Sequence, residues 1–185
     1  MPTLKVFVGL AVLLALTGAV AATRAQQPAP ESCGDASDMA ALIDCARKRE
    51  TNRAARCASS GPAPMSWPAP GDVIVPFGAA TKHGTHSKGL VIATPSEAIV
   101  KSPVAGVVLF AGAYRSYGQI VIIDACAHDV LLAGLTQIDV PAGGSLGLGQ
   151  PLGAMAKTSG DAPVLYIEAR RDGRPIDPAP LLGQR

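Results

Sequence analysis

The sequence of 185 residues is poor in aromatic and charged residues, and this scarcity excludes several classes of function. Aromatic residues make up 4% of the chain, too few for the stacking platforms that bind single-stranded nucleic acid. Charged residues make up only 16%, and two of the 16 basic residues, Lys5 and Arg24, account for the whole net charge of +2. The rest of the chain is neutral, and without a broad basic surface we expect no binding to nucleic acid.

Motifs of hydrolases and of metal sites are also lacking. The sequence contains no H-E-x-x-H motif and no Gly-rich phosphate-binding motif. Of its three histidines, His83 and His86 lie in a Gly-containing loop and His128 lies at an expected hairpin turn. A catalytic zinc needs three converging protein ligands and an open fourth position. Composition and spacing therefore predict neither a catalytic set nor a bound metal or other cofactor.

The first 25 residues have the pattern of a secretory signal peptide. A short basic start with Lys5 precedes the apolar run Val6–Leu16, and Ala19-Val20-Ala21 supplies the small residues that signal peptidases prefer. The alternative is a retained membrane anchor, but Val6–Ala22 is shorter than the ~20 residues needed to span a bilayer. We therefore expect a periplasmic or secreted bacterial protein that touches the membrane only if residues 1–25 are retained.

The chain has four cysteines, Cys33, Cys45, Cys57 and Cys126. Oxidising compartments permit disulfides, and no pair has the close C-x-x-C spacing of a zinc knuckle, so two disulfides are favoured over a metal site. Three pairings are open. Residues 26–58 form a short Cys-bearing segment in which Asp35–Arg56 has the apolar periodicity of a helix. An unbroken helix would place Cys45 and Cys57 about 18 Å apart, so either the helix breaks or each cysteine pairs elsewhere.

The remainder of the chain has the pattern of an all-β protein. Residues 59–70 are rich in proline, which prevents regular pairing, and are expected to form a linker. Residues 71–182 alternate short runs rich in Val, Ile and Leu with Gly, Pro or polar turns. The expected strands are Val73–Val75, Leu90–Ala93, Ile99–Lys101, Val107–Ala111, Gln119–Asp124, Val130–Leu135, Leu152–Met155 and Val164–Arg170. We therefore predict one all-β domain preceded by a short N-terminal helix.

Three polar side chains fall on one face of the last expected strand. Tyr166, Glu168 and Arg170 share this face because strand side chains alternate with a period of two. Two interpretations are open: a charged ladder on the surface, or part of a recognition groove. Spacing alone does not decide between them.

Five segments of the expected domain follow one another in a recognisable order. They are Lys88–Pro95, the pair Ser102–Gly112 and Ser116–Ile123, Gly143–Gly153, Tyr166–Arg171 and Gly173–Pro178. Each alone is a weak signal, but together they resemble the lysostaphin/LytM-type zinc peptidase domain, which acts on bacterial cell walls. The resemblance extends from Trp67 to Leu182. It implies an antiparallel β-sheet core built from a duplicated hybrid motif, in a two-layer or barrel-like arrangement.

The chain departs from this family at the positions that carry its chemistry. Active members have zinc-binding or catalytic side chains at five positions, which in this chain are Ser87, Val91, Gly134, Val164 and Tyr166. The family has His at the first, Asp at the second, a catalytic His at the third and a His-x-His pair at the last two. The resemblance therefore implies a domain that is not an enzyme and that holds no metal.

This pattern of losses, together with Leu131–Val140 and Val164–Arg170, is similar to the EnvC-like branch of murein hydrolase activators. The resemblance implies that the vacated groove binds a zinc-dependent N-acetylmuramoyl-L-alanine amidase and relieves its autoinhibition, so that peptidoglycan is split during cell division. The expected groove residues are Lys88, Val91, Tyr117, Leu135, Tyr166 and Arg170, with Lys88 and Arg170 at the rim. At each position the alternative is a side chain that packs the former site shut.

Two other functions are compatible with the same fold. One is a cell-wall-binding or scaffolding module that holds peptidoglycan without activating a hydrolase, and the other is a residual zinc endopeptidase that acts on peptidoglycan. The chain also departs from its branch, because EnvC-like proteins carry a long N-terminal coiled coil where this sequence has a short Cys-bearing helix. The recruitment step of the branch is therefore not carried over. One arrangement for the cysteines is that they staple this helix to the domain through Cys126.

Overall fold

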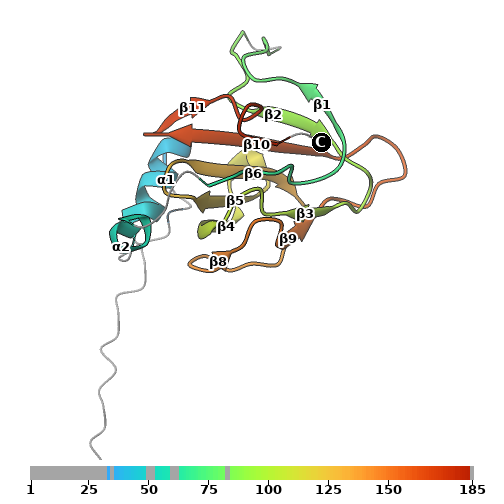
Figure 1. Ribbon diagram of the computed structural model, residues 1–185. Coiled ribbons are helices and arrows are strands. Elements are labelled where there is room, and N and C mark those ends of the chain that lie inside the picture. Colours follow the sequence, from blue (N-terminus) through green and yellow to red (C-terminus); the bar gives the residue numbers. More distant parts are fainter. Residues whose placement is uncertain (1–32, 34–35, 49–52, 59–62, 82–83, 184–185) are drawn as a thin grey trace, which may run out of the picture. The chain divides into compact units, whose positions relative to one another are not determined.

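The computed structural model describes residues 33, 36–48, 53–58, 63–81 and 84–183 (Figure 1). These residues belong to the unit Ser32–Arg185, which is separate from the unit Met1–Glu31. The expected signal peptide, residues 1–25, lies outside the described residues, as does His83. Among the helices of the described part, none has the length and apolar character needed to cross a membrane.

The strands form two antiparallel sheets (Figure 1). The larger sheet has the order β1-β2-β10-β6-β5-β4-β8, and β11 pairs with the end of β10. Its strands are β1 (Asp72–Val75), β2 (Leu90–Ala93), β4 (Gly106–Ala113), β5 (Gln119–Asp124), β6 (Asp129–Leu135), β8 (Ser145–Leu146), β10 (Val164–Arg171) and β11 (Arg174–Ile176). The smaller sheet has the order β3-β9-β7, made of β3 (Ile99–Lys101), β9 (Pro151–Ala154) and β7 (Gln137–Ile138). The prediction of an all-β domain with an antiparallel core is confirmed.

Most of the strand boundaries follow from the sequence pattern. All eight expected strands are present, and their ends agree with the observed ones to within two residues. The pattern does not predict β7, β8 or β11, because these strands of two or three residues do not stand out as runs rich in Val, Ile and Leu.

The main core lies between the two sheets. Leu165 and Ile167 of β10 point into it, and Val100 of β3 and Leu152 of β9 join the same cluster from the smaller sheet. All four side chains are fully buried. Tyr166, between the two β10 residues, belongs to a second cluster on the outer face of the larger sheet, as strand alternation requires.

The helix α1 (Met39–Lys48) covers this outer face (Figure 1). Its buried stripe consists of Met39, Leu42, Ile43 and Ala46, which confirms the helical periodicity. The sheet side of the same cluster includes Ile120, Ile122, Leu131 and Ala133. The described part of the expected helix Asp35–Arg56 contains α1, which ends at Lys48, and the start of a second helix, α2 (Arg53–Ala58). Residues 49–52 lie outside the described residues.

Each of these helices carries one cysteine of a disulfide. The two disulfides correspond to one of the three pairings that the sequence left open. Cys33 is bonded to Cys45 of α1, and Cys57 of α2 is bonded to Cys126. Cys126 lies in the turn between β5 and β6. The arrangement in which the helical segment is stapled to the domain through Cys126 is therefore the observed one.

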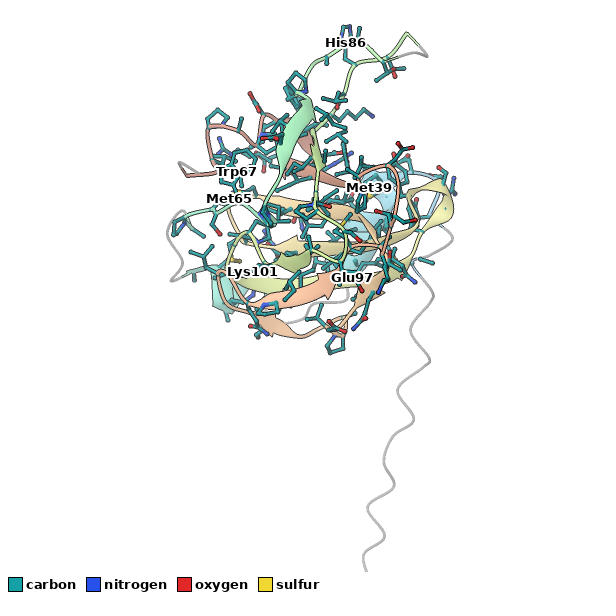
Figure 2. The ribbon with its side chains drawn as sticks, turned by 90° about the vertical axis from the view of Figure 1, so that its right-hand side faces the viewer. Met39, Met65, Trp67, His86, Glu97 and Lys101 are labelled. Atoms are coloured by element: carbon teal, nitrogen blue, oxygen red, sulfur yellow. A yellow bond between two sulfur atoms is a disulfide. The ribbon has the colours of Figure 1, made fainter. Side chains whose placement is uncertain are left out.

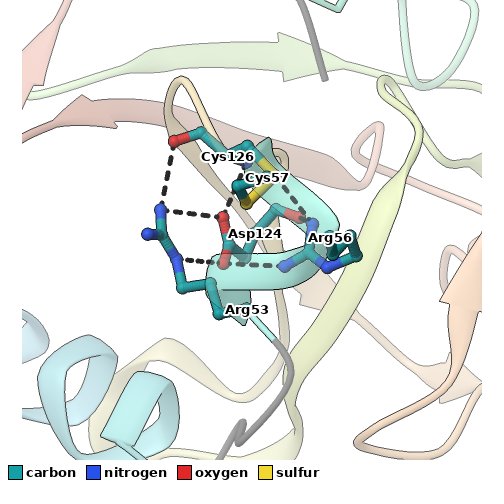
Figure 3. Close-up of a disulfide and its surroundings, with 5 residues drawn as sticks. All are labelled: Arg53, Arg56, Cys57, Asp124 and Cys126. Carbon is teal, nitrogen blue, oxygen red and sulfur yellow. Dashed lines mark hydrogen bonds and ion pairs between the residues drawn. A yellow bond between two sulfur atoms is a disulfide. The ribbon is translucent and has the colours of Figure 1, made fainter. Parts of the chain in front are cut away.

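Buried ion pairs reinforce the same attachment. Asp124 is fully buried, and it accepts hydrogen bonds from Arg53 Nε at 2.6 Å and Arg56 Nη2 at 2.9 Å, both from α2 (Figure 3). Asp129, which lies opposite Asp124 in the β5–β6 register, is paired with Arg47 of α1. Ion pairs from both helices and a disulfide from α2 therefore converge on the β5–β6 turn.

The described part of the expected linker packs onto the domain. Met65 and Ala69 are buried in the main core, and Met65 forms a parallel bridge with Leu182. Trp67 donates its indole N–H to the carbonyl of Gly183 at 2.8 Å. Prolines prevent hydrogen-bonded pairing in a sheet, but they do not prevent burial against one. Residues 63–70 therefore form an irregular segment that packs on the domain.

Candidate functional site

A groove with a volume of about 870 Å³ opens on the outer face of the larger sheet. Tyr166, Glu168 and Arg170 of β10 form its floor. Its walls are residues 37–40 at the start of α1, residues 85–88 before β2, and residues 114–117, which include the short 3-10 turn Arg115–Tyr117. Figure 2 shows that the segment carrying His86 projects away from the body of the sheets.

The structure brings four of the six expected groove residues together. Lys88, Tyr117, Tyr166 and Arg170 all line the groove, and Lys88 and Tyr117 are exposed. Val91 lies opposite Tyr166 in the β2–β10 register, half-buried and outside the lining. The expected groove position is therefore occupied mainly by tyrosines and cations rather than by aliphatic side chains.

Leu135 does not reach the groove. Strict alternation from Leu131 and Ala133 would place it on the outer face, but it is 4% exposed and belongs to the core between the sheets. The cause is a bulge, because one step along β5 from Gln119 to Ile120 corresponds to two steps along β6, with Gly134 as the extra residue. The bulge turns Leu135 to the opposite face of the sheet.

Arg170 does not lie at the rim of the groove, as expected, but in its floor. Only 5% of it is exposed, and its Nε donates to Glu168 Oε1 at 2.5 Å, while its Nη1 donates to the Gly173 carbonyl at 3.2 Å. Glu168 is also buried, and its Oε2 accepts the hydroxyl proton of Tyr166 at 2.5 Å. Tyr166 and Arg170 therefore both donate hydrogen bonds to the buried Glu168 between them. The interpretation of these residues as a charged ladder on the surface does not hold.

The Tyr166 hydroxyl remains a proton donor at every physiological pH. Burial raises the pKa of Tyr166, and the neighbouring negative charge of Glu168 raises it further. The hydroxyl is committed to the Glu168 carboxylate, so the floor of the groove offers a ring face rather than a base or an anionic ligand.

Gly134 is the residue at which we expect, from the resemblance, that active family members carry a catalytic histidine. Its backbone leaves no space for a side chain. Its φ is +94°, a conformation that L side chains rarely adopt. A Cβ at this residue would lie 2.4 Å from the carbonyl oxygen of Val164. Val164, the residue expected from the resemblance to replace another histidine, is 47% exposed.

Two further positions of the resemblance also lack ligand chemistry. Ser87 donates its hydroxyl proton to the Gly89 carbonyl at 2.8 Å, and Val91 presents an aliphatic side chain. Among the described residues, the group of His, Cys, Asp or Glu side chains close enough to hold a metal is Cys57, Asp124 and Cys126. Its two sulfurs form a disulfide, and its carboxylate is held by arginines, so this group is structural (Figure 3).

Sequence reasoning missed several groove residues that come from the helical segment and from the turn after β4. Ser37 and Asp38 belong to the helical segment, and Tyr114 and Arg115 belong to the turn after β4. No motif or spacing marks them, because their place in the groove depends on how α1 packs on the sheet. His86 also lines the groove, with its Nδ1–H donated to the Gly78 carbonyl at 2.8 Å.

Comparisons with known proteins agree with this geometry. The family model described as Peptidase family M23 matches residues 85–178. Over 120 residues the chain is 31% identical to the murein hydrolase activator EnvC of Escherichia coli K12. The matched region covers 64% of this chain and 29% of EnvC. Over 138 residues it is 33% identical to the murein hydrolase activator NlpD of Salmonella dublin, covering 69% of this chain and 34% of NlpD. The chain thus spans about a third of the length of these relatives.

Among solved structures, the antimicrobial peptidase lysostaphin from Staphylococcus simulans is similar, with a TM-score of 0.53 and 19% identity. The match covers 60% of this chain and 49% of that structure. At this identity the similarity concerns the fold alone, and it agrees with the lysostaphin/LytM-type architecture expected from the sequence.

Proposed function

Because the chain belongs to peptidase family M23, in the branch similar to the murein hydrolase activators EnvC and NlpD, we propose that it is a non-catalytic regulator of peptidoglycan hydrolysis. It acts in the periplasm by binding a zinc-dependent N-acetylmuramoyl-L-alanine amidase in its groove and activating it. The disulfides are in keeping with an oxidising compartment.

The observation that carries the proposal is the backbone at Gly134. A histidine at this position would need both a different φ and a displacement of the Val164 carbonyl. Loss of catalysis by a single side-chain change would leave a backbone still able to hold the original residue. Here strand β6 has a bulge shaped for glycine, which supports a domain with a role other than hydrolysis.

The groove has the properties of a surface for a partner helix. Tyrosine rings supply large contact areas at low entropic cost, and they are enriched where binding energy is concentrated. Lys88 is exposed at one wall and can pair with a carboxylate of the partner. A groove of this kind accepts the apolar face of an amphipathic helix. Activation follows if the groove binds the open form of the amidase more tightly than the closed form.

Reversal of the charge at Lys88 tests this surface. Lys88→Glu is expected to reduce activation of the amidase by about tenfold or more, because a carboxylate would face the acidic group of the partner. The midpoint of thermal unfolding should stay within a few degrees of the wild type, since Lys88 is exposed. Lys101→Glu is the matched control, because Lys101 is also exposed but lies on β3 of the smaller sheet. If both variants activate the amidase as well as the wild type does, Lys88 is not part of the binding surface.

The function itself is tested by release of dye from labelled peptidoglycan sacculi. The protein, purified from a bacterial periplasm with its disulfides intact, is assayed alone and with N-acetylmuramoyl-L-alanine amidases from the same organism. Release only in the mixture supports an activator. Release by the protein alone would show a residual zinc endopeptidase, and sedimentation with sacculi without any release would show a wall-binding or scaffolding module.

A further inference from the structure

We propose that the start of α1 is a working wall of the partner-binding groove and that the Cys33–Cys45 disulfide holds it in place. This wall consists of residues 37–40, which line the groove, and the preceding Ala36, and it comes from the Cys-bearing segment that precedes the family domain. The proposal rests on the proposed function, because it concerns the same groove. It predicts that the family domain by itself is an incomplete binding site.

The first support is the lining of the groove. Ser37, Asp38, Met39 and Ala40 contribute to it, together with residues 85–88. Ser37 and Asp38 are exposed, so they are accessible to a bound partner. Without this wall, the floor at Tyr166 and Arg170 would be open on one side.

The second support is that two walls of the groove are joined at one atom. The carbonyl oxygen of Ala36 accepts hydrogen bonds from Tyr114 Oη at 3.0 Å and from Arg115 Nη2 at 2.6 Å. Tyr114 is 2% exposed, so this contact is shielded, and the Arg115 guanidinium lies 5.6 Å from the centre of its ring. The position of residues 36–40 is therefore set by the turn at 114–117 and sets the width of the groove.

The third support is the place of the disulfide. Cys33 precedes the wall and Cys45 follows it within α1, so the bond closes a loop around residues 36–40. The later part of α1 is anchored independently, by the buried Leu42 and Ile43 and by the ion pair between Arg47 and Asp129. Loss of this disulfide is therefore expected to loosen the wall more than the helix.

The wall also adds a fixed negative charge to the groove. Asp38 Oδ1 accepts the backbone N–H of Ala41 at 2.9 Å, which caps α1 and lowers the pKa of Asp38. The groove thus presents Asp38 on one wall and Lys88 on another. It suits a helix of the amidase that carries an acidic residue toward Lys88 and a basic residue toward Asp38.

A bulky side chain on the wall tests its role directly. Ser37→Trp is expected to reduce activation of the amidase by about tenfold or more, because the indole would enter the space of a bound helix. Asp44→Trp is the matched control, since Asp44 is exposed on α1 but does not line the groove. The control should activate like the wild type.

A pair of disulfide variants supplies a second, independent test. Cys57→Ser/Cys126→Ser removes a bond between residues 69 apart, and Cys33→Ser/Cys45→Ser removes one between residues 12 apart. The first should lower stability more, because the longer loop restricts the unfolded chain more. The second should lower activation more, because only its bond brackets the wall. The order of the variants in thermal stability is therefore expected to be the reverse of their order in activation.

The outcomes separate this proposal from the proposed function. If wild-type protein activates no amidase, the proposed function fails, and the wall has no partner to bind. If the wild type activates but Ser37→Trp and the Cys33/Cys45 variant activate equally well, the proposed function stands and the wall is only structural. Loss of activation in those two variants alone, with the folded state retained by circular dichroism, supports the wall as part of the site.

Discussion

Replacement of Gly134 by alanine is expected to lower the free energy of unfolding by about 3 kcal/mol. Two effects add. The residue would be held at a φ of +94°, which L side chains rarely adopt, and its Cβ would lie 2.4 Å from the Val164 carbonyl oxygen. Neither strand can relax easily, because β10 is paired with both β2 and β6. Urea unfolding of the variant and the wild type measures the difference.

Gly149→Ala is the control for the backbone effect alone. Gly149 also has a positive φ, +76°, but nothing lies within 4 Å of its ideal Cβ. Its replacement should cost about 1 kcal/mol. Equal losses at the two glycines would mean that β6 moves away from Val164 at no cost. That result would also weaken the argument that this backbone excludes a histidine.

Replacement of Asp124 by asparagine is expected to cost about 3 kcal/mol, since it leaves Arg53 and Arg56 without their shared carboxylate. Both arginines are partly exposed, at 29% and 25% of their side chains, so water recovers some of the loss. The attachment of α2 should weaken with it, although the Cys57–Cys126 disulfide remains. Calorimetry or urea unfolding measures the total loss in free energy of unfolding. Faster hydrogen exchange in α2 would show that the loss is located at this helix.

The same replacement at Asp129 is the matched control. Asp129 lies opposite Asp124 in the register and is equally shielded, but its Oδ1 has no hydrogen-bond partner among the described residues. Burial raises the pKa of Asp129 despite its pairing with Arg47. Its charge is thus poorly compensated, and Asp129→Asn should cost only about 1 kcal/mol. A larger loss at Asp129 than at Asp124 would contradict this account.

Acid should act mainly through Asp124. Burial by itself raises the pKa of Asp124, but hydrogen bonds from Arg53 and from the Cys126 amide, with the charge of Arg56, outweigh it and lower the pKa. The unfolded state therefore binds more protons at low pH. Stability from this group is complete above the unfolded pKa of 3.8 and is lost as the pH falls through the lower folded value. The Asp124→Asn variant should lose less stability than the wild type over that range.

Local patterns in the sequence were sufficient for the architecture. Short apolar runs bounded by turn residues marked eight of the strands, and a period near 3.6 marked the buried stripe of α1. These patterns depend only on neighbouring residues. The resemblance to the LytM-type domain rests on local segments in the same way, and it led to Lys88, Tyr117, Tyr166 and Arg170 in the groove.

Only the tertiary structure decided which side chains reach the groove and how. The bulge at Gly134 turns Leu135 into the core. Alternation along the sequence does not predict this bulge, because the bulge depends on the pairing with the neighbouring strand. Arg170 is buried because Glu168 compensates its charge, whereas the sequence suggests exposure for an arginine. The wall at residues 36–40 and the helices beside it are held by contacts with residues 71 to 82 positions away in sequence. Sequence periodicity thus determines the elements of this protein, while long-range packing and charge compensation determine its site.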